Sequence, residues 1–264
     1  MTTLTPRALG FGEILDGGFT LYRKNFSTFF GVALAPQIPV ILYWIGVMAF
    51  VPAGIRDFAG FLIFPWTFFA TFLTLGALCI VTVWTYEGQD PGVRAPLAAG
   101  LRAWFPVAIA GVLAWLSVMF GVLFFILPGL FFLASFFAFA PVVMVEQTGP
   151  LRALQRSWDL SSGGRFRVLG ITLVAYLIIL IPMMAISVVG VGVAVGSAGF
   201  ATGDPAAMQG AEFWITGLLQ ILGPVVSALT WPFFVAVLTL LYLDRRARTE
   251  APDLEEAVGR LEGG

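Results

Sequence analysis

The sequence predicts an all-α integral membrane protein with six transmembrane helices, arranged as three hairpins that are each preceded by a cytoplasmic interfacial amphipathic helix. Its 264 residues are 59% hydrophobic and only 11% charged, with a mean hydropathy of +0.95. Soluble domains carry about 25% charged residues. The apolar residues form runs that are long enough to cross a hydrocarbon core about 30 Å thick. Short segments with one apolar and one charged face separate these runs.

The apolar runs define the six predicted spans. Two spans lie within residues 104–145, on either side of Leu127-Pro128-Gly129, because about 40 residues can cross the core twice at 1.5 Å per residue. The second of these is short, at about 16 residues, so a re-entrant hairpin is an alternative there. The other four spans cover residues 27–51, 58–86, 166–195 and 213–243.

The basic residues predict the orientation. All of the 14 lysines and arginines except Arg56 fall on one side of the predicted spans. Cytoplasmic loops carry an excess of Lys and Arg. Both termini are therefore predicted to be cytoplasmic, in a multi-pass protein of the inner (plasma) membrane, and the even number of spans agrees with this orientation.

The segment GFGEILDGGFTLYRKNF, residues 10–26, precedes the first span. On a helix its apolar side chains fall within an arc of about 140°, with the charged side chains opposite. This pattern predicts a helix that lies in the membrane interface and bends away from the first span near Asn25. The apolar arc contains Phe11, Ile14, Leu15, Phe19, Tyr22 and Phe26.

Similar amphipathic segments recur at residues 92–105, 149–160 and 252–262. Three apolar runs also end at an acidic residue, which is Glu87, Glu146 or Asp244. We therefore predict one membrane domain over residues 1–264, containing internal repeats and closed by an interfacial tail. The alternative is that such edges are common to polytopic proteins in general. The predicted repeats and tail cover residues 10–86, 92–146, 149–243 and 244–264.

Several chemistries are missing from the sequence. There is no histidine, Cys79 is the single cysteine, and no ionisable residue stands in the middle of a predicted span. Ion and proton pathways normally use intramembrane ionisable groups, and nucleophilic catalysis of the Ser-His or Cys-His kind needs a histidine. We predict no catalytic, cofactor-binding or metal-binding residue, no cofactor and no enzymatic activity. The net charge of −1 gives no indication of a nucleic-acid partner.

Two polar features remain. Gln37 stands between Pro36 and Pro39, which predicts either a kink with a helix–helix hydrogen bond or backbone groups open to a ligand. Four arginines cluster between the fourth and fifth spans, where they would face the anionic leaflet. They either contact anionic lipid or serve only to set the topology. These arginines are Arg152, Arg156, Arg165 and Arg167.

Three motifs carry a family resemblance. They read FGEILDGGFTLYRKNF, APVVMVEQTGPLRALQRSWDLSSGGRFRVLG and LLYLDRRARTEAPDLEEAV. Together they resemble the bacterial membrane-domain family that is named after glycerophosphoryl diester phosphodiesterase, over nearly the whole chain. The resemblance implies a six-span helical domain of largely unassigned function. It does not imply diesterase activity, because that catalysis relies on histidines. The family's EGxDL element departs slightly here, at residues 250–254.

Two functional hypotheses follow. The first is a non-catalytic scaffold or lipid-organising component of a membrane assembly, with membrane lipids and other membrane proteins as candidate partners. The second is a transporter or export permease for an amphipathic or lipid-like substrate, which broken spans and internal repeats would favour. A wide polar cavity at mid-membrane would distinguish the second from the first.

Overall fold

The computed structural model describes residues 9–52, 56–196 and 205–262, and every regular element in these ranges is a helix. Six stretches of the described chain are long and apolar enough to cross a membrane, which confirms the all-α membrane fold. The elements are α1 (Phe11–Lys24), α2 (Phe26–Leu34), η1 (Ala35–Gln37), α3 (Ile38–Phe50), α4 (Arg56–Tyr86), α5 (Arg94–Phe124), α6 (Ile126–Ser135), α7 (Phe139–Glu146), α8 (Pro150–Ser161), α9 (Arg165–Gly196) and α11 (Pro205–Glu262).

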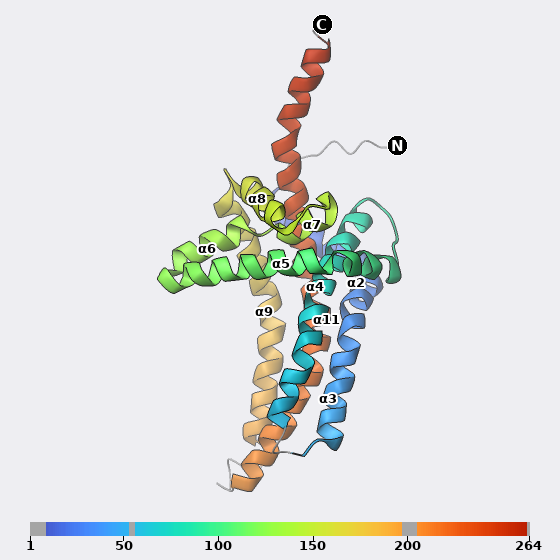
Figure 1. Ribbon diagram of the computed structural model, residues 1–264, viewed down its shortest axis with the longest axis vertical. Helices are drawn as coiled ribbons and strands as arrows, with labels where there is room; N and C mark the ends of the chain where they lie inside the picture. The colour runs from blue at the N-terminus through green and yellow to red at the C-terminus, as the bar shows by residue number, and fades with distance from the viewer. Residues whose placement is uncertain (1–8, 53–55, 197–204, 263–264) are drawn as a thin grey trace.

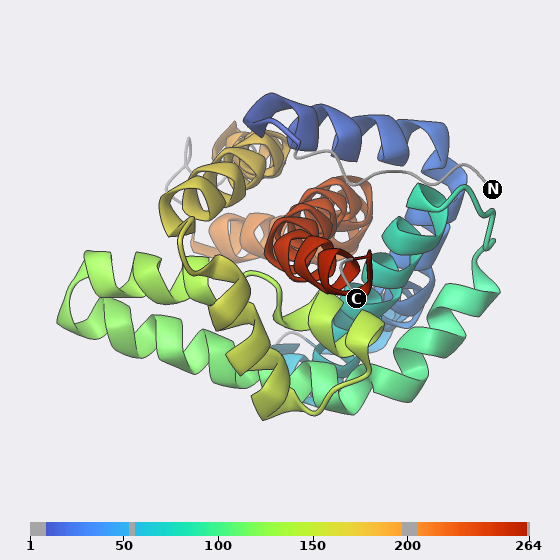
Figure 2. The same cartoon turned by 90° about the horizontal axis from the view of Figure 1, so that it is seen from above.

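Helix α11 is the centre of the fold. It runs alongside α3, α4 and α9 as an elongated bundle (Figure 1), and seen from above it is surrounded by the other elements (Figure 2). Its stretch from Val235 to Tyr242 contains some of the most deeply buried side chains of the protein. The core therefore sits at the end of the bundle where α1, α7 and α8 meet α11.

Helix α1 forms where the amphipathic pattern predicts it, and the chain bends at Asn25. The Glu13 carboxylate accepts a hydrogen bond from the Gly10 amide at 2.6 Å, which caps the first turn. The Asn25 side chain donates to the Leu21 carbonyl at 3.1 Å and closes the last turn. The helix is thus confirmed, while its position in the membrane interface stays a prediction.

The inner face of α1 packs closely on α11. Ile14 and Gly18 are buried. A Cβ atom added at Gly18 would lie 2.6 Å from Cγ2 of Val237, which is nearer than real Cβ atoms come to other heavy atoms. Glycine weakens a helix by about 1 kcal/mol relative to alanine. Gly18 nevertheless stabilises the fold, because it lets the two helices approach.

The first span is kinked at its prolines. Pro39 has no N–H to donate to the carbonyl of Ala35, so α2 gives way to the short helix η1 before α3 begins. The Trp66 indole of α4 donates to the Pro36 carbonyl at 3.1 Å. Of the two interpretations of this segment, the structure supports a kink with a helix–helix hydrogen bond.

The predicted third and fourth spans differ in detail from the expectation. The amphipathic segment at residues 92–105 is not a separate helix but the first turns of α5, which continues through Pro106. The fourth stretch is divided into α6 and α7. Figure 1 shows α5 and α6 side by side, running across the direction of α3, α9 and α11. This hairpin therefore does not lie parallel to the bundle.

The C-terminal tail also differs from the expectation. Helix α11 continues without a break through residues 252–262 and projects along its own axis beyond α1 and α8 (Figure 1). The side chains of residues 251–264 lie outside the described part of the chain. Three of the predicted amphipathic segments, α1, the start of α5 and α8, surround α11 when seen from above (Figure 2), and α5 and α8 lie toward the same end of the bundle (Figure 1). The internal repeat itself stays a prediction.

Candidate functional site

A cluster of charged side chains surrounds α11 at the end where the core lies, and Asp244 is its centre. The Asp244 side chain is only 1% exposed. Its carboxylate accepts hydrogen bonds from Nη1 of Arg167 at 2.8 Å, from Nε of Arg248 at 2.9 Å and from the amide of Leu9 at 2.9 Å. A buried charge is tolerated when it is paired and hydrogen-bonded, and Asp244 meets both conditions.

The same two arginines hold the chain ahead of α1. Both Arg167 and Arg248 donate to the carbonyl of Leu9, the latter at 2.9 Å. The backbone N–H of Leu9 is bound by Asp244. Both peptide groups of this residue are therefore fixed by side chains from α9 and α11.

A second group of contacts joins α7 and α8 to α11. Oε1 of Glu146 accepts from the Tyr242 hydroxyl at 3.0 Å and from Nε of Arg156 at 3.3 Å. Arg156 also pairs with Glu250, which in turn pairs with Arg246 at 3.1 Å. Burial opposes the charge on Arg156, but the two carboxylates outweigh it and raise the pKa of the guanidinium.

Arg245 fixes the turn between α8 and α9. It donates to the carbonyl oxygens of Leu160 at 2.7 Å and Ser162 at 2.6 Å. A Cβ atom at Gly164 would lie 2.7 Å from Nη1 of Arg245, so a larger residue there would displace the guanidinium. Gly163 has φ +72°, which glycine adopts without strain. The segment from Tyr242 to Glu250 thus ties together the N-terminal segment, α7, α8 and α9.

The structure gives different surroundings to the four arginines that the sequence singles out. Arg156 and Arg167 are held in the ion pairs of this cluster. Arg152 is exposed on α8, and Arg165 stands at the start of α9. The prediction of anionic-lipid contact therefore concerns mainly Arg152 and Arg165, because the other two already have carboxylate partners.

Arg165 borders an apolar groove between α6 and α9. Its guanidinium carbon lies 4.7 Å from the centre of the Phe131 ring and 4.8 Å from that of Trp158, and cations are attracted to aromatic rings at such distances. Its Nε atom is buried and has no hydrogen-bond partner. The groove measures about 710 Å³. Its lining consists mainly of Leu127, Leu130, Phe131, Ala134, Phe166 and Leu169, together with Arg165 and Arg167.

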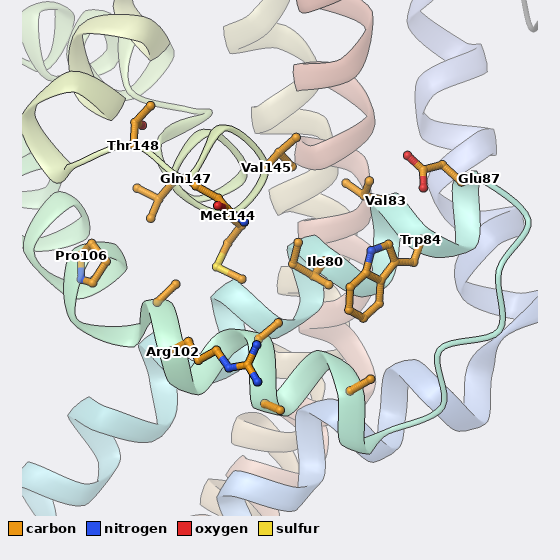
Figure 3. A pocket seen from close by; sticks show the side chains of 15 residues that line it. Ile80, Val83, Trp84, Glu87, Arg102, Pro106, Met144, Val145, Gln147 and Thr148 are labelled. Atoms are coloured by element: carbon orange, nitrogen blue, oxygen red, sulfur yellow. The ribbon is translucent and has the colours of Figure 1, made fainter.

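A larger cavity of about 800 Å³ lies between α4, α5 and α7. Figure 3 shows Arg102 of α5 on one side of it, opposite Met144, Gln147 and Thr148. The Oγ1 atom of Thr148 is buried without a hydrogen-bond partner. Glu87, at the end of α4, also lines this cavity. The cavity is thus at the arginine-bearing end of the bundle and not at its middle.

Among the residues that the structure describes, no group of histidine, cysteine or acidic side chains is placed to hold a metal ion. A scan against protein-family models, a search of curated proteins and a search of solved structures find no match to this chain. The family resemblance therefore rests on the three sequence motifs alone.

Proposed function

We propose that this protein is a non-catalytic membrane component that organises anionic lipid at the cytoplasmic face of the inner membrane, as a member of the membrane-domain family that its motifs resemble. The observation that carries the proposal is the groove at Arg165. There the Arg165 guanidinium, whose Nε has no hydrogen-bond partner, borders the apolar groove between α6 and α9. A phosphate group and an acyl chain are the two parts of a ligand that such a surface fits.

The chemistry of the groove agrees with a phospholipid. The guanidinium is planar and binds phosphate oxygens through two parallel N–H groups. The rings of Phe131 and Trp158 both contact the guanidinium and hold it at the groove. The apolar lining from Leu127 to Ala134 provides a wall for hydrocarbon. Arginines near the membrane surface attract anionic lipid by about 1 kcal/mol each.

Lipid retention after purification tests this proposal. We expect Arg165→Gln to retain less anionic phospholipid in mild detergent than the unchanged protein, by roughly fivefold if one arginine contributes about 1 kcal/mol. Arg94→Gln is the control for surface charge alone, because Arg94 is exposed at the start of α5 and does not line the groove. The proposal requires Arg165→Gln to lose more lipid than Arg94→Gln does. Equal retention by the two variants would contradict the proposal. Mass spectrometry of the bound lipids gives the measurement.

The cytoplasmic orientation belongs to the same proposal. Helices α1 and α8 lie at one end of the bundle and the end of α3 lies at the other (Figure 1). With Cys79 changed to Ala, we expect Pro52→Cys to react with an impermeant thiol reagent on intact cells. Gln155→Cys, on the exposed face of α8, should react only after permeabilisation. The reverse labelling pattern would mean that the protein has the opposite orientation in the membrane.

The alternative function is a transporter or export permease for a lipid-like substrate. The cavity of about 800 Å³ with Arg102 at its wall favours this alternative. A scaffold should leave the flip rate of a fluorescent phospholipid in reconstituted vesicles unchanged. Rapid flipping that Arg102→Gln abolishes would favour the transporter instead, while leaving lipid retention at Arg165 as a separate question.

A further inference from the structure

We infer that the hairpin of α5 and α6 does not cross the bilayer but lies within one leaflet, at the arginine-bearing end of the protein, surrounded by acyl chains. The segments Phe26–Phe50, Phe58–Tyr86, Arg165–Val188 and Gly217–Glu250 are then the ones that cross. This placement does not depend on whether Arg165 binds a headgroup.

The direction of the hairpin is the first argument. Helices α5 and α6 run side by side across the axis along which α3, α9 and α11 extend (Figure 1). If those helices cross the membrane, α5 and α6 lie along its plane. In the view from above, the hairpin extends sideways from the bundle (Figure 2).

Contacts with α8 fix the depth of the hairpin. The Trp158 ring of α8 lies 5.3 Å from that of Phe131, 6.3 Å from that of Phe132 and 5.9 Å from that of Phe136. Aromatic pairs at these separations are stabilising. The same helix carries the exposed Arg152. Helix α6 is therefore held at the level of an arginine-bearing surface helix.

The returning helix is too short to cross. Helix α6 has 10 residues, which extend about 15 Å, or half of the hydrocarbon core. The chain then turns before α7, and Ser157 of α8 stabilises the turn. Its hydroxyl donates to the carbonyl of Ser135 at 2.9 Å and accepts from the amide of Ala138 at 3.0 Å. Since these backbone groups are satisfied by a side chain, α6 and α7 need not form one straight helix.

The composition of the hairpin tip fits a hydrocarbon environment. Residues 103–145 contain no charged side chain. Close packing of the two helices is possible because a Cβ at Gly121 would lie 2.7 Å from the amide nitrogen of Gly129. Beyond this contact, four consecutive side chains, Phe124–Leu127, are each at least 61% exposed. A second copy of the chain would cover only one face of the tip. Because side chains are exposed all around the tip, acyl chains are the surroundings that fit it.

Depth measurement by spin labelling tests the inference in the full chain reconstituted into vesicles, with Cys79 changed to Ala. Labels go to Leu116→Cys and Leu123→Cys on α5, which are both exposed and seven residues apart. A helix crossing the membrane would separate them by about 10 Å along the membrane normal. We expect their depths to agree within a few ångströms, inside the hydrocarbon region.

Phe166→Cys and Leu173→Cys form the matched control, because they have the same spacing on α9 and should differ in depth by about 10 Å. Three results would overturn the inference. A depth difference on α5 as large as that on α9 would mean that the hairpin crosses. A label at Leu123 that is reached by a water-soluble paramagnetic reagent would place the tip in water. Protection from both oxygen and that reagent would show that protein covers it.

Discussion

Replacing Asp244 by Asn tests the charged cluster at its centre. The substitution keeps the size of the side chain but removes the charge that Arg167 and Arg248 share. The amide oxygen of Asn can still accept a hydrogen bond, but its NH2 group can only donate and would face the N–H groups that the carboxylate had accepted from. One ion-pair partner on each arginine is lost, and the anchoring of Leu9 is weakened.

The expected cost follows from burial. Removing one partner of a fully buried ion pair costs about 3–5 kcal/mol. Asp244 is 1% exposed, but the arginine side chains are 27% and 35% exposed and can regain water. We therefore expect the lower end, about 3 kcal/mol. For a chain of this length that loss lowers Tm by roughly 6 to 12 °C.

Thermal unfolding in mild detergent measures the shift, with Asp159→Asn as the control. Asp159 is an exposed residue of α8, and changes at exposed sites usually stay within about 0.5 kcal/mol. If Asp244→Asn melts within 1 °C of Asp159→Asn, the cluster does not stabilise the fold and the reasoning fails. Limited proteolysis adds a local measurement, because the segment at Leu9 should become easier to cleave.

Two further predictions concern packing and the turn before α7. Gly18→Ala should lower the free energy of unfolding by about 1–3 kcal/mol, because the added methyl group would collide with Val237. Gly12→Ala is the control, because nothing lies within 4 Å of its added methyl group, and it should raise the free energy of unfolding by up to about 1 kcal/mol. The thermal melts of the two variants should therefore shift in opposite directions. Ser157→Ala should cost about 1–3 kcal/mol because it leaves the amide of Ala138 without an acceptor, and faster hydrogen exchange at that amide would be its local signature.

The sequence predicted those features that depend on local pattern. Hydropathy located the six apolar stretches, and the amphipathic spacing located α1 together with its end near Asn25. The prolines at 36 and 39 placed the kink in the first span. Each of these features is determined by neighbouring residues, so the chain alone is enough to find them.

Features that depend on distant residues were not predicted. The acidic residues that end the apolar runs were visible, but nothing local shows that Asp244 pairs with Arg167, 77 residues away. The pairing of Arg156 with Glu250 was not predicted either, because Glu250 is 94 residues away in the chain. Hydropathy gives the length of a helix and not its direction. The short fourth stretch left a re-entrant hairpin open as an alternative, but the crosswise direction of α5 and α6 was not predicted. Gly121 and Gly129 allow α5 and α6 to approach closely on either side of their turn, but only the structure shows that these two glycines lie together.

The contacts between the two ends of the chain have a consequence for the order of synthesis. Leu9 leaves the ribosome before its partner Asp244, which follows 235 residues later. At about 5–20 residues per second, that interval lasts roughly 10 to 50 s. During this time α1 has no α11 to pack against, and the membrane surface can hold its apolar face. Helix α11, which follows all the other described helices in the chain, is thus the one that joins α1 to the rest of the bundle.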